Sequence, residues 1–262
     1  MTAKGSGKVL VEELGPVLLM TLNRPEVLNA VDGELTDQLG KALSLLEESS
    51  RLRVGVITGS GRAFCAGLDM KAVANGACIE KTRNPVWGFA GIAERQLSKP
   101  LIAAVNGDAV GGGFEIVLAC DLAVSVPSAR FGLPEVKHGL IAAGGGIFRM
   151  SQQVPTKIAS EILLTGRIFP ASEAVRWGMV NAVAPQPVLE DALRMADLIA
   201  KNGPIAVQAT KRLHQATIGA PAAEVRAGGA HEREAANVFL SRDAEEGISA
   251  FMRGTQATST GT

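Results

Sequence analysis

Glu115 is a carboxylate set among apolar residues, in the segment Phe-Glu-Ile-Val-Leu-Ala-Cys that starts at position 114. A carboxylate in such surroundings is costly to bury unless it is paired or protonated, which makes it a candidate for acid–base chemistry. The alternative from the residues alone is compensation of the helix dipole in a first helical turn. Glu135, in Phe-Gly-Leu-Pro-Glu-Val, is by itself explained equally well as an exposed loop carboxylate.

Glycine-rich segments follow two of the predicted buried strands. One runs from 64 to 70 as Phe-Cys-Ala-Gly-Leu-Asp-Met, and the other from 106 to 115 as Asn-Gly-Asp-Ala-Val-Gly-Gly-Gly-Phe-Glu. The second is predicted to open a helix, whose first N–H groups lack internal partners and carry partial positive charge. Gly112 is therefore a candidate donor to an oxyanion. The alternative is that these glycines only allow a helix and a strand to pack closely.

The elements that must position these residues follow from hydrophobic periodicity. Asp32 is expected to cap a helix whose apolar face is Leu35, Leu39, Leu43 and Leu46. Short apolar runs predict strands at 9–13, 17–22, 54–58, 101–105, 122–126 and 180–183. Further helices are expected at 112–119, 144–152, 157–164, 171–177, 187–201, 204–217, 221–239 and 243–253. Strands and helices thus alternate before an all-helical end, and the small polar tail 254–262 is expected to fray.

Composition narrows the possible functions. With 262 residues, 47% of them apolar, the chain can bury a sizeable core in one large domain. A formal net charge of zero and the absence of Tyr argue against binding to nucleic acid or to an anionic membrane. The three cysteines form no Cys-x-x-Cys pair and the three histidines lack metal-ligand spacing, so neither a disulfide framework nor a metal site is expected. No apolar stretch is long enough to span a membrane, and a cytoplasmic protein is expected.

Several motifs, in their order and spacing, resemble the enoyl-CoA hydratase/isomerase (crotonase) superfamily over residues 9 to 253. They are Asn-Arg-Pro at 23–25, Leu-Asn-Ala at 28–30, Phe-Cys-Ala-Gly-Leu-Asp at 64–69, Gly-Gly-Gly-Phe-Glu at 111–115, Ala-Cys-Asp at 119–121, Phe-Gly-Leu-Pro-Glu at 131–135 and Ala-Val-Arg-Trp-Gly-Met-Val-Asn at 174–181. The resemblance implies an α/β fold, a crotonase-type spiral of repeated ββα units. On this basis we expect a catalytic core at 1–200 and a C-terminal helical region for trimer contacts at 201–262, in a homotrimer or a hexamer made of two trimers.

The resemblance also implies a chemistry. By motif position, the backbone N–H groups of Leu68 and Gly112 form an oxyanion hole for a thioester enolate. Family members that hydrate enoyl thioesters carry two glutamates at the positions that match Glu115 and Glu135. Glu115 is then expected to activate a water for attack on the β-carbon, and Glu135 to exchange a proton with the α-carbon. No separate cofactor is implied, because coenzyme A enters as part of the acyl-CoA substrate.

Substrate and coenzyme A are expected, again from the resemblance, to lie against the two glycine-rich segments and the early loop. The positions concerned are Arg24, Leu28, Ala30, Ala66, Gly67, Asp69, Lys71 and Gly111. For Arg24 and Lys71 the alternative to phosphate binding is a solvated surface charge, and Asp69 is expected to brace its loop. One departure lies near Glu135, where many relatives have Pro-Gly-x-Gly and this chain has Ala-Ala-Gly-Gly-Gly at 142–146.

The expected reaction is hydration of a trans-2-enoyl-CoA to a 3-hydroxyacyl-CoA, or its reverse. Segments around Glu115, Glu135 and 175–178 also resemble carnitinyl-CoA dehydratase, so dehydration of a substituted acyl-CoA is an alternative. Enoyl-CoA isomerisation is another, and a non-catalytic or RNA-binding relative on the same fold is a third.

A few further side chains have two interpretations. His138 is an acid–base partner of Glu135 or a surface residue, and Cys65 is a nucleophile or a buried packing residue. Trp87 and Phe89 either line an acyl pocket or pack in the core.

Overall fold

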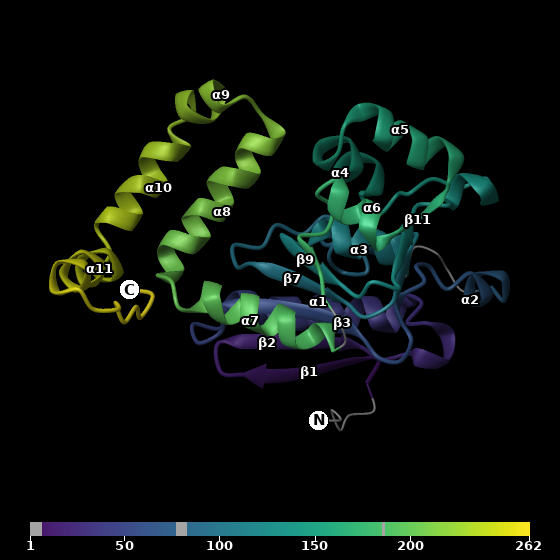
Figure 1. The fold of residues 1–262 in the computed structure, drawn as a ribbon, viewed down its shortest axis with the longest axis horizontal. Helices are drawn as coiled ribbons and strands as arrows, with labels where there is room; N and C mark the ends of the chain where they lie inside the picture. Colours follow the sequence, from purple (N-terminus) through teal and green to yellow (C-terminus); the bar gives the residue numbers. More distant parts are fainter. Residues whose placement is uncertain (1–6, 77–82, 185–186) are drawn as a thin grey trace.

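The core is built on a six-stranded sheet in the order β1-β2-β3-β7-β9-β12 (Figure 1). The structure is a computed structural model that describes residues 7–76, 83–184 and 187–262. β1 is antiparallel to β2, and every other neighbouring pair is parallel. The strands are Val9–Leu14 (β1), Val17–Leu22 (β2), Val54–Gly59 (β3), Leu101–Val105 (β7), Leu122–Ser125 (β9) and Ala182–Val183 (β12).

A smaller sheet, in the order β11-β10-β8-β4, lies beyond the ends of these strands. Its strands are Ala63–Cys65 (β4), Asp108–Val110 (β8), Arg130–Gly132 (β10) and Ile168–Pro170 (β11), and a separate hairpin pairs Arg83–Asn84 (β5) with Gly88–Phe89 (β6). β3 leads to β4 and α2 (Met70–Ala74), and β7 leads to β8 and α3 (Gly112–Ala119), so each unit gives one strand to each sheet before its helix. This is the ββα repeat that the sequence predicts. Because β4 pairs with β8, the segments that follow these two strands emerge side by side.

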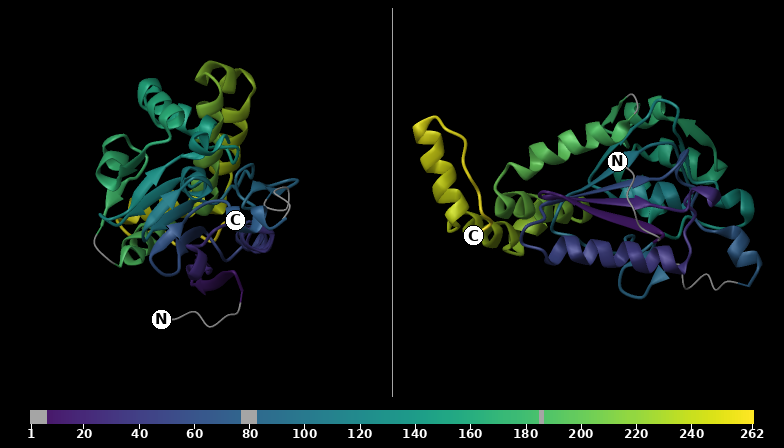
Figure 2. Two further views of the ribbon diagram at one scale, coloured as in Figure 1. Left: turned by 90° about the vertical axis from the view of Figure 1, so that its right-hand side faces the viewer. Right: turned by 90° about the horizontal axis from the view of Figure 1, so that it is seen from below.

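Helices cover both faces of the large sheet, because its central strands are buried apolar runs that need cover on both sides. α1 (Gly33–Glu48) is capped by Asp32, whose side chain accepts a hydrogen bond from the N–H of Leu35 at 2.9 Å. The predicted leucine face of α1 is buried, and α7 (Val188–Ala200) packs on β3 and β7. Figure 2 shows α1 and α7 on opposite sides of the sheet. The other helices of the core are Pro25–Val27 (η1), Met70–Ala74 (α2), Gly112–Ala119 (α3), Glu135–His138 (η3), Gly146–Gln153 (α4), Thr156–Thr165 (α5) and Ala171–Arg176 (α6).

The all-helical end leaves the core as an arm (Figures 1 and 2). It contains Pro204–Gly219 (α8), Ala222–Ala227 (α9), Ala230–Phe239 (α10) and Arg242–Arg253 (α11). The prediction of one helix over 221–239 is wrong, because Gly229 adopts a φ of 68° and separates α9 from α10. No helix among the described residues is long and apolar enough to cross a membrane.

The expectation that the tail frays is also wrong. The carboxylate of Asp243 accepts hydrogen bonds from the N–H groups of Thr260 at 2.7 Å and Gly261 at 3.0 Å. Arg53 donates to the carbonyl oxygens of Ala200 and Ser259, at 2.7 and 2.5 Å. The tail is thereby fixed to both the arm and the core, which a small polar composition alone does not indicate.

Candidate active site

The segment after β4 turns one N–H group toward the centre of the molecule. Val31 bridges this segment by donating its N–H to the carbonyl of Gly67 at 2.7 Å and by accepting from the N–H of Asp69 at 3.0 Å. The N–H group of Leu68, the residue between them, points away from Val31, because successive N–H groups of an extended chain point to opposite sides. Gly67 has a φ of +87°, which favours glycine at this turn.

The segment after β8 brings a second N–H group beside the first. Gly111 ends the strand with a φ of 57°, and its carbonyl accepts hydrogen bonds from the N–H groups of Phe114 and Glu115. Gly112 is the first residue of α3, so its own N–H has no acceptor within the helix. A Cβ built on Gly67 would lie 2.8 Å from the N of Gly112, which shows how closely the two segments approach.

Glu115 is buried, with 4% of its surface exposed, and its carboxylate lies in a loop of glycines. Its Oε1 accepts a hydrogen bond from the N–H of Gly146 at 2.8 Å. A Cβ on Gly144 would lie 2.6 Å from Oε2, and one on Gly146 would lie 2.8 Å from Oε1, so only glycines leave room here. Burial raises the pKa of Glu115 to about 7, opposed by the Gly146 N–H and reinforced by the negative charge of Glu135.

Glu135 begins η3 and faces the same cavity from the opposite loop. Its Oε2 is buried and has no hydrogen-bond partner within the described part of the chain, and its Oε1 lies 3.1 Å from where a Cβ on Gly111 would stand. Burial also raises the pKa of Glu135, opposed by its own backbone N–H and by His138. A buried carboxylate oxygen without a partner is well placed to bind a polar group of a ligand.

The two glutamates keep their relative position because aromatic packing joins the elements that carry them. Phe114, beside Glu115, packs on Phe131 of β10 with ring centroids 5.4 Å apart, and β10 leads to Glu135. Phe169 of β11 packs against both rings, at 5.7 and 6.1 Å, and contacts Trp177 at 5.7 Å. The separation of the carboxylates is thus set by the core.

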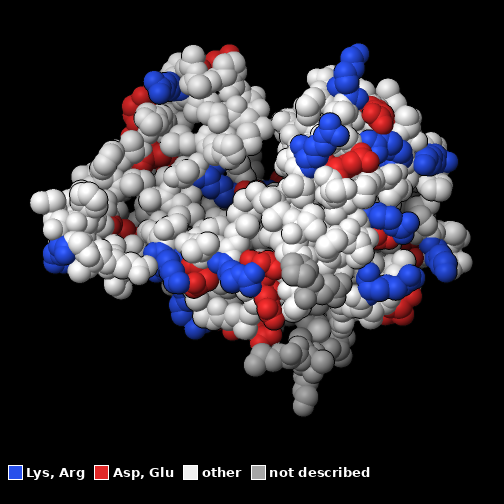
Figure 3. Space-filling view, in the orientation of Figure 1, with Lys and Arg blue, Asp and Glu red and all other residues white. Residues whose placement is uncertain are grey.

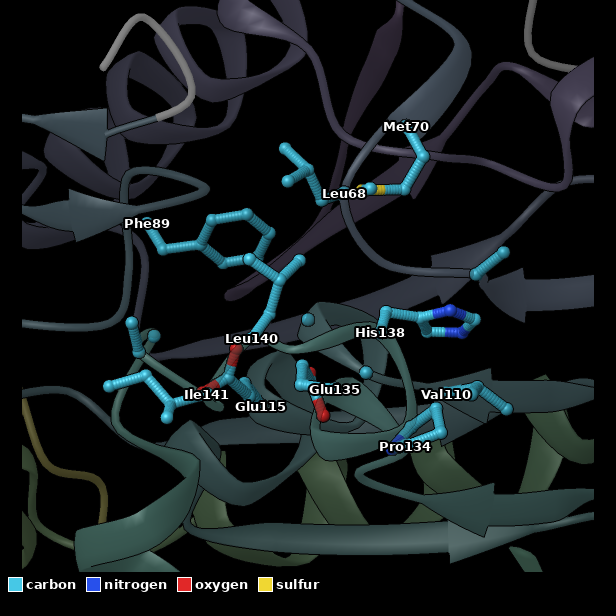
Figure 4. Close-up of a pocket in the computed structure, with 15 residues that line it drawn as sticks. Leu68, Met70, Phe89, Val110, Glu115, Pro134, Glu135, His138, Leu140 and Ile141 are labelled. Atoms are coloured by element: carbon cyan, nitrogen blue, oxygen red, sulfur yellow. The ribbon is translucent and has the colours of Figure 1, made fainter. Parts of the chain in front are cut away.

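Both glutamates and both backbone segments line one cavity of about 430 Å³ (Figure 4). Most of its other walls are apolar, and they include Leu68, Met70, Phe89, Val110, Leu140 and Ile141. The structure separates the two aromatic candidates: Phe89 lines the cavity, while Trp87 packs on Gly40 and under the guanidinium of Arg95, 4.5 Å from its ring. A Cβ on Gly112 would overlap the Phe89 ring, so glycine at 112 allows this wall to close.

The early loop is docked on the first of these segments. The side-chain amide of Asn29 donates to the carbonyls of Ser60, Ala63 and Phe64, and the carbonyl of Leu28 accepts from the N–H of Ala66 at 2.9 Å. Leu28 and Ala30 are therefore held beside Ala66. They are not among the residues that line the cavity itself.

Arg24 and Asp69 are joined in an internal network. The Arg24 guanidinium lies 3.0 Å from the carboxylate of Asp69 and 3.3 Å from that of Asp32, and it also donates to the carbonyl of Ala30. Asp69 in turn caps α2 by accepting from the N–H of Ala72 at 3.0 Å. Lys71, by contrast, is exposed on α2. Arg24 and Asp69 thus brace the first segment from inside, whereas Lys71 faces solvent.

Cys65 and His138 also have defined positions. Cys65 is fully buried, its Sγ contacts the carbonyl of Asn29 at 3.1 Å, and burial raises its pKa to about 12, which disfavours the nucleophilic thiolate. His138 lines the cavity yet is exposed in η3, close to Glu135. The sequence places the glycines at 144–146 near Glu135, whereas Gly144 and Gly146 lie against the carboxylate of Glu115. Arg149 was missed, because its position follows from no local pattern.

Charged groups do not form an extended single-sign region on the face drawn in Figure 3, where blue and red side chains are interspersed. Within the described residues, no group of His, Cys, Asp and Glu is arranged to hold a metal ion. Residues 77–82 lie outside the described residues.

Comparison with known proteins identifies the family. The enoyl-CoA hydratase/isomerase family matches residues 12–259. A carnitinyl-CoA dehydratase from Citrobacter koseri is 41% identical over 244 residues, which cover 90% of this chain and 92% of that protein. An enoyl-CoA hydratase structure from Mycobacterium tuberculosis H37Rv is 40% identical with a TM-score of 0.92, over 98% of this chain and 100% of that one. A carnitinyl-CoA hydratase structure from Mycobacterium avium is 44% identical with a TM-score of 0.78, over 97% of this chain and 98% of that one. These matches confirm the predicted crotonase fold, and the chain belongs to the enoyl-CoA hydratase/isomerase (crotonase) family.

Proposed function

We propose that this protein adds water to a trans-2-enoyl-CoA to give a 3-hydroxyacyl-CoA, and catalyses the reverse reaction. The observation that carries the proposal is the convergence of two glutamates and two adjacent backbone segments on one cavity. Membership of the family implies an acyl-CoA substrate. The cavity then has to bind a thioester, hold a water and stabilise an enolate.

The oxyanion hole in this proposal consists of the N–H groups of Leu68 and Gly112. As hydroxide adds to the β-carbon, the π electrons move toward the thioester carbonyl, whose oxygen becomes negative. Two fixed N–H donors stabilise that oxygen without reorganising, and each such donor contributes about 2.7–4 kcal/mol to transition-state stability.

The glutamates divide the proton transfers between them. Ionised Glu115 takes a proton from the bound water, whose oxygen bonds to the β-carbon, and protonated Glu135 gives a proton to the α-carbon. Burial raises the pKa of both carboxyl groups, so each holds a proton more readily than an exposed glutamate does. In the dehydration direction the two roles reverse.

Coenzyme A is proposed to lie along the segments that frame the cavity. Backbone around Leu28, Ala30 and Ala66 is positioned to contact the adenine end and the pantetheine arm, and Gly67 and Gly111 allow the thioester to approach closely. The exposed ammonium of Lys71 is available to a phosphate. Arg24 and Asp69 contribute by bracing the loop, since both side chains are already engaged with each other.

The test is hydration of crotonyl-CoA, followed by loss of the enoyl absorbance. We expect Glu115→Gln and Glu135→Gln each to reduce kcat by about 10²–10⁴-fold, because each removes one proton-transfer group while keeping the side-chain shape. Glu161→Gln, a change of the same kind on the exposed face of α5, is the control and should leave kcat unchanged. Full activity of both cavity variants would contradict the assignment.

A second candidate is dehydration of carnitinyl-CoA, which the names of the Citrobacter and Mycobacterium avium relatives suggest. Its acyl group carries a quaternary ammonium, a cation that proteins commonly bind against aromatic faces. Among the described residues that line the cavity, Phe89 is the only Phe, Tyr or Trp, which favours an uncharged acyl group. Turnover of carnitinyl-CoA without turnover of crotonyl-CoA would reverse this preference.

We also propose that the protein assembles as a homotrimer or as a pair of trimers. The support is the arm, whose last two helices expose the apolar side chains of Phe239, Leu240, Ile248, Phe251 and Met252. Large apolar side chains grouped in this way are typical of surfaces that another subunit covers.

A further inference from the structure

Arg149 lies in α4, and its side chain turns back toward the loop that precedes this helix. Its Nη2 donates to the carbonyl of Ala93 at 2.5 Å, and its Nη1 lies 3.5 Å from the carbonyl of Gly144. The space for the guanidinium exists because residue 145 is glycine, since a Cβ there would overlap Nη1. One side chain therefore contacts two segments that are far apart in the sequence, since Ala93 and Gly144 are separated by 51 positions.

These two segments form the walls around Glu115. The N–H of Ala93 donates to the carbonyl of Phe89 at 3.1 Å, and the Phe89 ring closes the cavity against Gly112. The other segment supplies the N–H of Gly146 to the carboxylate of Glu115. A run of glycines is conformationally free on its own, so something else must hold its N–H groups in place.

We propose that Arg149 is a positioning residue for water activation, because its guanidinium fixes the Gly144–Gly146 loop and so holds the Glu115 carboxylate toward the bound water. The expected effect on kcat rests on the proposed function. The expected effect on the ionisation of the Glu115 carboxyl in the free protein does not.

The charges around this pair define the expected direction of the change. Glu115 faces Arg149 and Glu135, and Arg149 also faces Cys120 and Glu94. The positive charge of Arg149 lowers the pKa of Glu115, while burial and the charge of Glu135 raise it. Loss of the guanidinium should therefore raise the pKa of Glu115 further, and keep it protonated at higher pH.

The experiment compares Arg149→Met and Arg149→Lys with the matched control Arg53→Met. Arg53 also donates from its guanidinium to two backbone carbonyls, those of Ala200 and Ser259, but it does not line the cavity. For each protein, kcat and KM for crotonyl-CoA are measured as a function of pH. The titration of Glu115 is followed without substrate, by infrared difference spectra in which Glu115→Gln identifies the carboxyl band.

For Arg149→Met we expect kcat to fall by roughly 10- to 10²-fold with little change in KM, because the loop that orients the base is misplaced. The midpoint of the Glu115 titration should move to higher pH. Arg149→Lys keeps the charge and should keep the midpoint near the wild-type value. Its kcat should still fall, because an ammonium on a flexible stem cannot replace the planar fork across two carbonyls. Arg53→Met should resemble the wild type in both measurements.

An unchanged midpoint in Arg149→Met would overturn the proposal, and so would an unchanged kcat in an active enzyme. Equal effects in Arg53→Met would also overturn it, since they would indicate general destabilisation. If the wild type fails to hydrate crotonyl-CoA, the proposed function fails, and the infrared titration alone then decides the role of Arg149.

Discussion

At the scale of single residues, the carboxyl groups of Glu115 and Glu135 are chemically identical but have different hydrogen-bond surroundings. Glu115 accepts hydrogen bonds from backbone N–H groups in a closed loop, whereas Glu135 keeps one buried oxygen without a partner among the described residues. Burial raises the pKa of both carboxyl groups, and the negative charge of Glu135 raises the pKa of Glu115 further. The proposed mechanism uses this difference by assigning the base role to Glu115 and the acid role to Glu135.

The raised pKa of Glu115 predicts that its ionisation costs stability. Its folded-state pKa of about 7 exceeds the ordinary glutamate value of 4.5, so the stability that the neutral form contributes is full below pH 4.5. That contribution is lost as the pH rises to about 7, and the loss is on the order of 3 kcal/mol at about 1.4 kcal/mol per pKa unit. We therefore expect Glu115→Gln to be more stable than the wild type at pH 8 but not at pH 4, as measured by urea unfolding. Glu224→Gln, on the exposed α9, serves as the control, and an equal difference at both pH values would contradict the prediction.

At the scale of elements, the site depends on loops whose positions are fixed from outside the loops themselves. Asn29, which is fully buried, ties the early loop to β4 through the carbonyls of Ala63 and Phe64 and to the segment before β4 through the carbonyl of Ser60. The glycine loop before α4 is contacted by the long side chain of Arg149 at the carbonyl of Gly144. Segments rich in glycine thus become rigid because neighbouring side chains satisfy their backbone groups.

Gly146→Ala should reduce kcat by on the order of 10²-fold while the protein remains folded. The new Cβ would lie 2.8 Å from Oε1 of Glu115, so the carboxylate must move from its hydrogen bond, and small displacements of a reacting group are costly. Gly219→Ala, at the end of α8 where a Cβ meets nothing within 4 Å, is the matched control. The hydration assay and the melting temperature are measured for both variants. Normal kcat in Gly146→Ala would show that the carboxylate tolerates the shift.

The sequence was sufficient for the elements with a clear local pattern. The apolar runs at 54–58 and 101–105 are the central strands β3 and β7, and the leucine spacing identified α1 with its Asp32 cap. Three-residue strands such as β4 and β8 are too short to show a period, so they were not predicted as strands. Arg149 was missed for another reason, since its contact with Ala93 depends on the tertiary fold. Glu115 and Glu135 were chosen through the family resemblance, and the structure adds that they face one cavity.

At the scale of the whole molecule, the arm exposes several large apolar side chains. Phe251 and Met252 on α11 are 83% and 79% exposed, and Phe239 on α10 is 77% exposed. Burial of such side chains between subunits would stabilise an assembly by about 25 cal/mol for each Å² of apolar area removed from water.

Phe251→Asp should therefore shift the protein toward smaller species, as measured by size-exclusion chromatography with light scattering. A carboxylate introduced into a buried apolar contact is strongly unfavourable, whereas the same change on a free surface has little effect. Leu198→Asp, at a residue 67% exposed on α7, is the comparison. A wild type that is monomeric at micromolar concentration would contradict the proposed assembly.

The buried thiol of Cys65 offers a way to measure how often the loops around the site separate. Its Sγ lies against the carbonyl of Asn29, between the early loop and the segment that carries Leu68, and its pKa is raised to about 12. An alkylating reagent can reach this sulfur only when the two loops separate, so the labelling rate at position 65 reports how often they do. A thioester bound across both loops would slow that labelling in proportion to its occupancy, and peptide mapping would distinguish this sulfur from the other cysteines.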